Sequence, residues 1–157
     1  SSLNFDGTDD YINTNKTIMP NKDFSISSWF YTTNQLNYEP IVSQYAPSQA
    51  GRLWFGLNSN TFGYRIGTQS QTTNIETNKW YFGTIVRKDN EVKLYLDGQL
   101  KNTSTATDDI YQTNTQIGGD SNFGFFEGKI DDVRIYNYAL TNEQVKQIYN
   151  GGAVSFN

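Results

Sequence analysis

The chain has 157 residues, of which 36% are hydrophobic and 15% aromatic, and its formal net charge is −4. This length and this share of aromatic residues predict a single domain over residues 1–157 and exclude a disordered chain. Histidine and cysteine are absent, which excludes Ser-His-Asp and Cys-His catalysis, zinc sites built on imidazole or thiolate, haem ligation and disulfides.

Short runs of alternating residues, separated by turn residues, recur along the first half of the chain and are typical of a β-sandwich. Residues 3–6 and 11–12 predict two short strands around a turn that contains Gly7. Residues 24–31 predict a strand with aromatic side chains on both of its faces. Further strands are expected at residues 41–45, 53–57 and 62–66.

The second half begins with a clear hairpin, made by residues 80–87 and 92–96. Residues 129–138 predict a long strand near the C-terminus. The polar segments 67–78 and 101–114 contain few apolar residues, so we expect loops there. Asn, Thr, Ser and Gln together outnumber the charged residues, a composition that disfavours helices and favours an all-β fold.

One helix is expected, close to the C-terminus. Thr141 can cap its N-terminus, and Val145, Ile148 and Tyr149 recur at the spacing of one helix face. Gly151 follows the last of these residues and ends the helix. The sequence therefore predicts an all-β sandwich with a short C-terminal helix.

Four segments resemble one protein family in their order and spacing. They are LNFDGTDDYI at residues 3–12, FSISSW at 24–29, the segment 80–98 that ends in LYLDG, and GKIDDVRIYNYALT at 128–141. Together they resemble the laminin-G-like branch of the concanavalin A-like lectin/glucanase superfamily. The resemblance implies a jelly-roll β-sandwich of two curved antiparallel sheets, one of them concave. It also implies that a bound calcium ion and carbohydrate or cell-surface binding are common properties of the family.

The enzymes of this superfamily offer a direct comparison. Its retaining glycosidases resemble one another in a Glu-x-Asp-x-x-Glu run on one strand, and this chain has no such run. Glu127 and Asp131 would share one strand face, but residues four apart on a strand lie about 13 Å apart. A retaining mechanism needs carboxyl groups roughly 5 to 5.5 Å apart. We therefore predict that the chain is not an enzyme; acids from separate strands that meet in space are the alternative.

The carboxylates point to calcium, because an acidic chain without histidine or cysteine readily builds only hard-cation sites of oxygen ligands. The resemblance implies that Asp131 is a calcium ligand, joined by oxygens from near the N-terminal strand. We expect Asp131, Asp6 and Asp9 to share one ion that ties the terminal strands together. The alternative is that the N-terminal acids make Asx-turns and that Asp131 or its neighbour pairs with Arg134 or Lys129.

The three tryptophans divide into two groups. Trp29 and Trp80 are expected to pack between or beside the sheets. Trp54 alternates with Leu53, so if the leucine face is the core, Trp54 and Arg52 point outward. Such an outward tryptophan forms a platform on which the apolar face of a sugar ring can stack.

The same alternation on the neighbouring predicted strands adds further residues to this platform. The predicted carbohydrate-binding residues are Trp54, Arg52, Arg65, Tyr81 and Arg87. The arginines suit a carboxylated or sulfated glycan, and solvated arginines beside a neutral sugar are the alternative. The glycine- and phenylalanine-rich loop at residues 118–126 either covers one end of a ligand groove or plugs the edge of the sandwich.

These observations favour a non-catalytic, calcium-stabilised carbohydrate-binding module that recognises a glycan on a concave face or loop rim. A cell-surface adhesion, protein-interaction or spacer module without sugar binding is the alternative. With only 12 Lys and Arg against 16 Asp and Glu, nucleic acid is not an expected partner. No apolar run approaches the ~18 residues of a membrane span, so membrane insertion is not expected. We expect an extracellular module of a larger, multidomain, secreted bacterial protein.

Overall fold

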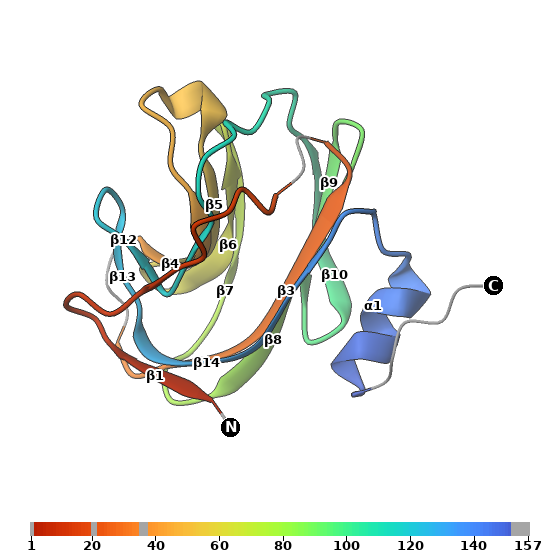
Figure 1. The fold of residues 1–157 in the computed structure, drawn as a ribbon. Coiled ribbons are helices and arrows are strands. Elements are labelled where there is room, and N and C mark those ends of the chain that lie inside the picture. Colours follow the sequence, from red (N-terminus) through yellow and green to blue (C-terminus); the bar gives the residue numbers. More distant parts are fainter. Residues whose placement is uncertain (1, 20–21, 35–37, 152–157) are drawn as a thin grey trace.

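Two six-stranded antiparallel sheets face each other in the computed structural model, which describes residues 2–19, 22–34 and 38–151 (Figure 1). In spatial order, sheet A contains β1 (Leu3–Asp6), β14 (Glu127–Tyr136), β3 (Phe24–Thr32), β8 (Trp80–Lys88), β9 (Glu91–Leu96) and β10 (Gln99–Thr105). Sheet B contains β2 (Ile12–Asn13), β11 (Gln116–Ile117), β4 (Glu39–Gln44), β5 (Leu53–Asn58), β6 (Thr61–Ile66) and β7 (Gln69–Asn74). A short 3₁₀ turn, η1 (Gln49–Gly51), precedes β5, and a small separate ladder joins β12 (Gly119–Asp120) and β13 (Gly124–Phe125). The predicted all-β jelly-roll sandwich of two antiparallel sheets is confirmed.

The first strand lies beside the last one. In Figure 1 the red β1 runs along the blue β14, and the register pairs Leu3 with Ile130 and Asp6 with Glu127. On its other side β14 pairs with β3, which continues through β8 into the hairpin β8–β9. The first and last strands are therefore joined at one edge of sheet A by backbone hydrogen bonds.

The core fills the space between the sheets, as the alternating pattern of the strands requires. β3 contributes Phe30 and β6 contributes Phe62, whose rings stack with 5.0 Å between centroids. Gly83 on β8 makes room for this pair, because a Cβ at that position would lie 2.3 Å from Phe62 Cζ. Aromatic side chains in the core thus hold the two sheets together.

The predicted C-terminal helix is confirmed as α1 (Asn142–Tyr149). Its N-cap is Thr141, whose side chain and that of Gln144 form a reciprocal capping box. The helix packs on the outer face of sheet A (Figure 1), where it covers a second apolar cluster. Trp29 lies in this cluster, 5.7 Å from the Tyr149 ring and 5.2 Å from that of Phe82. Trp29 therefore packs beside a sheet, as expected. Among the described residues, no helix is long and apolar enough to cross a membrane.

Two strands lie where the sequence predicted loops. β7 falls inside the predicted loop 67–78, and β10 overlaps the predicted loop 101–114. Both are edge strands, β7 in sheet B and β10 in sheet A. Their side chains are mostly polar and exposed or half-buried, so they show no apolar alternation. Each is held by the backbone ladder of its neighbour, which a pattern of hydrophobic residues does not reveal.

Candidate functional site

A row of directly paired residues crosses the outer face of sheet B. Ser43 on β4 pairs with Trp54 on β5, Trp54 pairs with Arg65 on β6, and Arg65 pairs with Ser70 on β7. Leu53 on the opposite face of β5 is fully buried in the core. The structure thus places Trp54 and Arg65 side by side on the face that points away from the core, where the alternation predicted each of them.

Trp54 and Arg65 line a pocket on this face. The pocket has a volume of about 70 Å³ and is lined by Tyr38, Trp54, Asn58, Tyr64, Arg65, Ser70, Thr72 and Phe123. Its walls combine aromatic rings with amide, hydroxyl and guanidinium groups. This mixture suits a ligand that has both apolar faces and hydrogen-bonding groups.

Trp54 forms a buried surface rather than the predicted open platform. Only 3% of its surface is exposed. Tyr38 packs against it edge to face, with 6.2 Å between the ring centroids. Among the described residues, Trp54 Nε1 has no hydrogen-bond partner. A buried N–H group in this state costs about 1–3 kcal/mol, so a residue of the pocket wall carries a donor for which the described residues supply no acceptor.

Tyr38 was not predicted from the sequence. Its φ of +60° lies in the left-handed region, which is uncommon for a bulky residue and costs about 1–3 kcal/mol. Such strain persists only where the surroundings impose it and is concentrated at binding sites. An isolated tyrosine in a polar segment carries no periodic signal, so nothing in the sequence marked it.

Two paired glycines lie on the same strand faces as Trp54 and Arg65. Gly56 on β5 pairs with Gly63 on β6. A Cβ at Gly56 would lie 2.3 Å from the carbonyl oxygen of Glu39, and one at Gly63 would lie 2.0 Å from that of Gln71. The neighbouring backbones therefore approach these two positions too closely for any side chain.

The two arginines on this side of the molecule are held by neutral groups. Arg65 donates from Nε to the Gly67 carbonyl at 2.8 Å and from Nη2 to Gln49 Oε1 at 2.7 Å. Arg52 donates from Nε to the Ala46 carbonyl at 3.0 Å, and its guanidinium carbon lies 4.9 Å from the centroid of the Tyr45 ring. Within the described chain neither arginine makes a salt bridge, so both keep an uncompensated positive charge.

The loop between β12 and β13 reaches the same pocket through Phe123. Asp120 anchors this loop: it is 1% exposed, and its Oδ1 accepts from the N–H and the side-chain amide of Asn122 at 2.8 and 2.9 Å. Ser43 Oγ donates to its other oxygen at 3.4 Å. Phe126, three residues beyond Phe123, is buried in the core. The loop therefore combines both expected roles, since one phenylalanine borders a pocket and another fills the sandwich.

The prediction that Tyr81 and Arg87 join this platform is wrong. Both lie on β8 in sheet A, where they pair with the core residues Phe30 and Phe24 and so point between the sheets. Tyr81 is 5% exposed, and its hydroxyl accepts from the Glu76 N–H at 3.1 Å.

Arg87 is fully buried and serves the fold. It donates to the carbonyl oxygens of Asp89, Ala106 and Asp108 at 3.1, 3.0 and 2.9 Å. Burial lowers the pKa of its guanidinium, and the nearby carboxylate of Asp109 opposes that shift. Two of these contacts, with the carbonyls of Ala106 and Asp108, tie the segment after β10 to sheet A.

The predicted metal ligands do not come together as expected. The ligand oxygens of Asp6, Asp9 and Asp10 lie within 4.8 Å of one another on the turn after β1. Asp131 is not among them, because Asp6 pairs with Glu127, and four residues of strand separate Glu127 from Asp131 by about 13 Å. The structure therefore does not bring Asp131 to Asp6 and Asp9, and the cluster that forms instead includes Asp10, which the predicted ligand set left out.

The alternative contacts expected for these acids are present. The Thr8 N–H donates to Asp6 Oδ1 at 2.8 Å, which is an Asx-turn. Arg134 forms an ion pair with Asp132, with 2.8 Å between Nη2 and Oδ2. The three clustered acids are exposed and retain free oxygen lone pairs, so their donor set still fits a hard cation.

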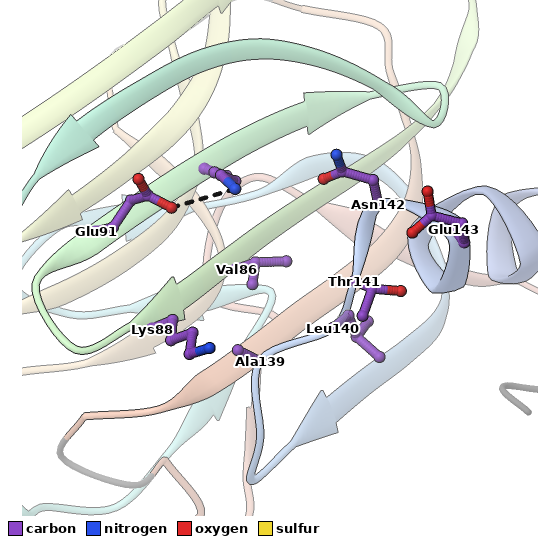
Figure 2. Close-up of a pocket in the computed structure, with 9 residues that line it drawn as sticks. Val86, Lys88, Glu91, Ala139, Leu140, Thr141, Asn142 and Glu143 are labelled. Atoms are coloured by element: carbon purple, nitrogen blue, oxygen red, sulfur yellow. Dashed lines mark ion pairs between the residues drawn. The ribbon is translucent and has the colours of Figure 1, made fainter. Parts of the chain in front are cut away.

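A larger hollow of about 310 Å³ lies between the outer face of sheet A and the start of α1 (Figure 2). None of the predicted binding residues lines it. Lys93 and Glu91 on its wall form an ion pair at 3.2 Å, drawn as a dashed line in Figure 2. The capping box of Thr141 already satisfies the first turn of the helix. These polar groups of the hollow already have partners within the protein, whereas Trp54 Nε1 has none among the described residues. The pocket at Trp54 is therefore the better candidate for a ligand site.

Comparisons with known proteins agree with this architecture. A family model described as the concanavalin A-like lectin/glucanases superfamily matches residues 6–146. Domain 4 of an extracellular arabinanase from Geobacillus stearothermophilus, solved with arabinotriose, superposes with a TM-score of 0.80 at 19% identity, over 94% of this chain and 76% of that one. A pentraxin from Limulus polyphemus gives 0.71 at 17% identity, over 94% and 81%. The receptor-binding domain of botulinum neurotoxin D gives a TM-score of 0.70 at 20% identity, over 96% of this chain and 43% of that one.

A search of curated proteins found no match. The chain belongs to the concanavalin A-like lectin/glucanase superfamily.

Proposed function

We propose that the chain is a non-catalytic carbohydrate-binding module that takes a glycan in the pocket on the outer face of sheet B. The observation that carries this proposal is Trp54, a buried residue of the pocket wall whose indole N–H has no partner among the described residues. A sugar hydroxyl can accept this hydrogen bond, and the apolar face of a sugar ring can stack on the aromatic rings beside it. The arabinotriose complex of the similar arabinanase domain supports the same ligand class.

Binding without hydrolysis is the better reading of this pocket. No lining residue in the described part of the chain is acidic, whereas glycoside hydrolysis uses a pair of carboxyl groups. Asp120, which anchors the nearby loop, accepts three hydrogen bonds from its own surroundings. Its role as an anchor leaves it unsuited to proton transfer.

We further propose that calcium binds at the turn formed by Asp6, Asp9 and Asp10, in place of the predicted set with Asp131. The closeness of three exposed carboxylates supports this proposal, since calcium gathers six to eight oxygens from carboxylates, carbonyls and water. The turn lies directly after β1. A bound ion would therefore stabilise the pairing of the terminal strands.

The similar solved structures support an extracellular location for this chain. One is a single domain of an extracellular arabinanase, and another is the receptor-binding domain of a toxin. We therefore propose that this module belongs to a larger secreted protein of several domains.

The function is tested by binding of the purified protein to a glycan array and to immobilised polysaccharides. We expect retention on at least one glycan. Trp54→Ala should lower the affinity for that glycan by about tenfold or more. The matched control is Tyr111→Ala, since Tyr111 is 55% exposed and does not line the pocket; it should bind as the unchanged protein does. A protein that retains no glycan would refute the proposal and leave an adhesion or spacer role.

A further inference from the structure

A second row of paired residues crosses the outer face of sheet A. Asn4 on β1 pairs with Lys129 on β14, Lys129 pairs with Tyr31 on β3, and Tyr31 pairs with Trp80 on β8. The adjacent residue on each of these strands is buried in the core, as Phe30 is on β3. The four side chains of the row therefore share the outward face of four neighbouring strands, which lie side by side in Figure 1.

The aromatic pair in this row differs from the rest of the sheet. Trp80 was expected to be buried, but 38% of its surface is exposed. Two residue pairs further along the same two strands, Trp29 and Phe82 lie beneath α1 and contact Tyr149. The helix thus covers one half of this sheet face and leaves Trp80 in contact with solvent. Together with Tyr31 beside it, Trp80 gives this part of the sheet an aromatic surface on which a ligand can stack.

The two rings are held in place by their surroundings. The centroids of Tyr31 and Trp80 lie 5.7 Å apart, with 48° between the ring planes. The Tyr31 hydroxyl donates to Asn78 Oδ1 at 3.3 Å, and Lys129 Nζ lies 5.8 Å from the Tyr31 ring centroid. Because the rings are already oriented, a ligand that stacks on them loses little side-chain entropy to them.

A groove of about 270 Å³ runs beside Tyr31. Its polar lining includes Asn4, Asp6, Thr33, Glu127 and Lys129. The carboxylates and the amide oxygen accept hydrogen bonds, while the amide, hydroxyl and ammonium groups donate them. An apolar ring surface next to such a groove matches a ligand that has both C–H faces and many hydroxyl groups.

The charges of the groove select among such ligands. Glu127 and Lys129 cancel each other's charge, whereas Asp6 belongs to the cluster with Asp9 and Asp10. With calcium bound, this cluster of three carboxylates keeps one net negative charge, and without calcium it carries three. Phosphorylated, sulfated and carboxylated ligands are repelled by this arrangement. A stable protein interface buries about 800 Å² on each partner around an apolar centre, and two rings among charged groups do not provide such a centre.

We propose that the row of Asn4, Lys129, Tyr31 and Trp80 is a second glycan-binding surface, specific for a neutral oligosaccharide. It lies on the sheet opposite the pocket of Trp54, so its existence does not depend on that pocket. A module with both surfaces engages two glycan chains at once, which raises its avidity for a polysaccharide without any further contact.

The three tryptophans make this proposal testable in a single protein, because each indole N–H gives a separate nuclear magnetic resonance signal. Trp80 reports on the row, Trp54 on the pocket and Trp29 on the cluster under α1. We would titrate the protein with arabinotriose, xylotetraose, mannotetraose and cellotetraose. At least one of them should shift the Trp80 signal in a saturable manner while the Trp29 signal stays fixed.

Variants connect this shift to the row. Tyr31→Ala should weaken the Trp80 response by about tenfold, because one stacking ring is lost. Tyr31→Phe keeps the ring and should stay within about twofold of the unchanged protein. If Tyr31→Ala does not fold, Lys129→Ala, at an exposed position of the same row, should weaken the response instead. A Trp80 signal that none of the four sugars moves, or a response unchanged in Tyr31→Ala, would overturn the proposal.

The same spectra separate this proposal from the proposed function. A shift of Trp80 with Trp54 unmoved supports the row and counts against the pocket. A shift of Trp54 alone supports the pocket and overturns the row. In Trp54→Phe the Trp80 response should persist; its loss would mean that both signals report one site and would overturn a second surface.

Discussion

Tyr38 lies edge-on against Trp54, with 6.2 Å between the ring centroids and 72° between the ring planes. Tyr38 is 44% exposed, whereas Trp54 is 3% exposed. One ring thus covers the other from solvent, and the backbone of Tyr38 is strained at a φ of +60° in the same place. The contact explains why the tryptophan forms a pocket wall rather than an open platform.

Removal of this contact should open the pocket. In Tyr38→Ala the Trp54 indole N–H should exchange with solvent faster, because burial alone protects a group to which the described residues offer no acceptor. Tyr38→Gly removes the same ring but adopts a positive φ freely, so it should be more stable than Tyr38→Ala by about 1 kcal/mol. Hydrogen exchange of the indole signal and urea unfolding measure the two effects. An unchanged exchange rate would mean that Tyr38 does not shield Trp54.

Gly63→Ala should destabilise the protein, although glycine-to-alanine changes on strands are normally neutral or stabilising. The new Cβ would meet the Gln71 carbonyl oxygen at 2.0 Å, and we expect a loss of about 2–3 kcal/mol in the free energy of unfolding. Gly151→Ala is the matched control, since no atom lies within 4 Å of its Cβ position and only its positive φ opposes the change. A smaller loss for Gly63→Ala than for Gly151→Ala would contradict the close backbone approach.

Arg87→Met should be strongly destabilising, because the carbonyl oxygens of Asp89, Ala106 and Asp108 would lose their donor. We expect the free energy of unfolding to fall by about 2–5 kcal/mol. Arg65→Gln, on the half-exposed outer face of sheet B, should change it by less than about 1 kcal/mol. Chemical denaturation of the two variants checks the difference; equal effects would argue against the structural role of Arg87.

Burial also predicts the alkaline behaviour of the protein. Burial raises the pKa of Tyr64 above its ordinary value of 10.0, and the hydrogen bond with Ser104 opposes the shift only in part. A raised folded-state pKa contributes stability that is complete below pH 10 and is lost as the pH rises through the folded pKa. Tyr64→Phe should therefore show a smaller loss of stability above pH 10 than the unchanged protein. Tyr64→Phe should still lose some stability above pH 10, because burial raises the pKa of Tyr95 as well. Urea unfolding at pH 8 to pH 11 tests the sign.

Calcium should stabilise the native state by mass action. At 100 times its dissociation constant the gain is about 2.7 kcal/mol, which corresponds to a rise of about 5–10 °C in Tm for a domain of this size. Chelator should reverse the rise, and Asp10→Asn should abolish it. Asp131→Asn is the matched control, because Asp131 lies outside the acidic cluster, and it should keep the rise. If calcium does not change the Tm of the unchanged protein, the proposal that calcium binds the native state is wrong.

The sequence predicted the positions of some residues of the candidate site correctly and those of others wrongly. The alternation of Leu53 with Trp54 is a property of the strand itself, and it placed Trp54 and Arg65 on the face away from the core. Arg87 follows an equally regular alternation, yet β8 belongs to the other sheet, and its polar end is buried by the segment after β10. Which face of a strand meets the core depends on its neighbours, so the same local pattern led to one correct and one wrong placement.

The sequence by itself determined the elements whose signals are local. The alternating strands, the hairpin β8–β9 and the helix capped by Thr141 follow from side-chain period and from the hydrogen-bonding needs of helix ends. Tertiary structure alone decided the polar edge strands β7 and β10, the cover of Tyr38 on Trp54, and the separation of Asp131 from Asp6. Each of these depends on how a strand pairs with its neighbours in the sheet, and it is this pairing that gives the aromatic, amide- and hydroxyl-rich chain its pocket in one sheet and its exposed row in the other.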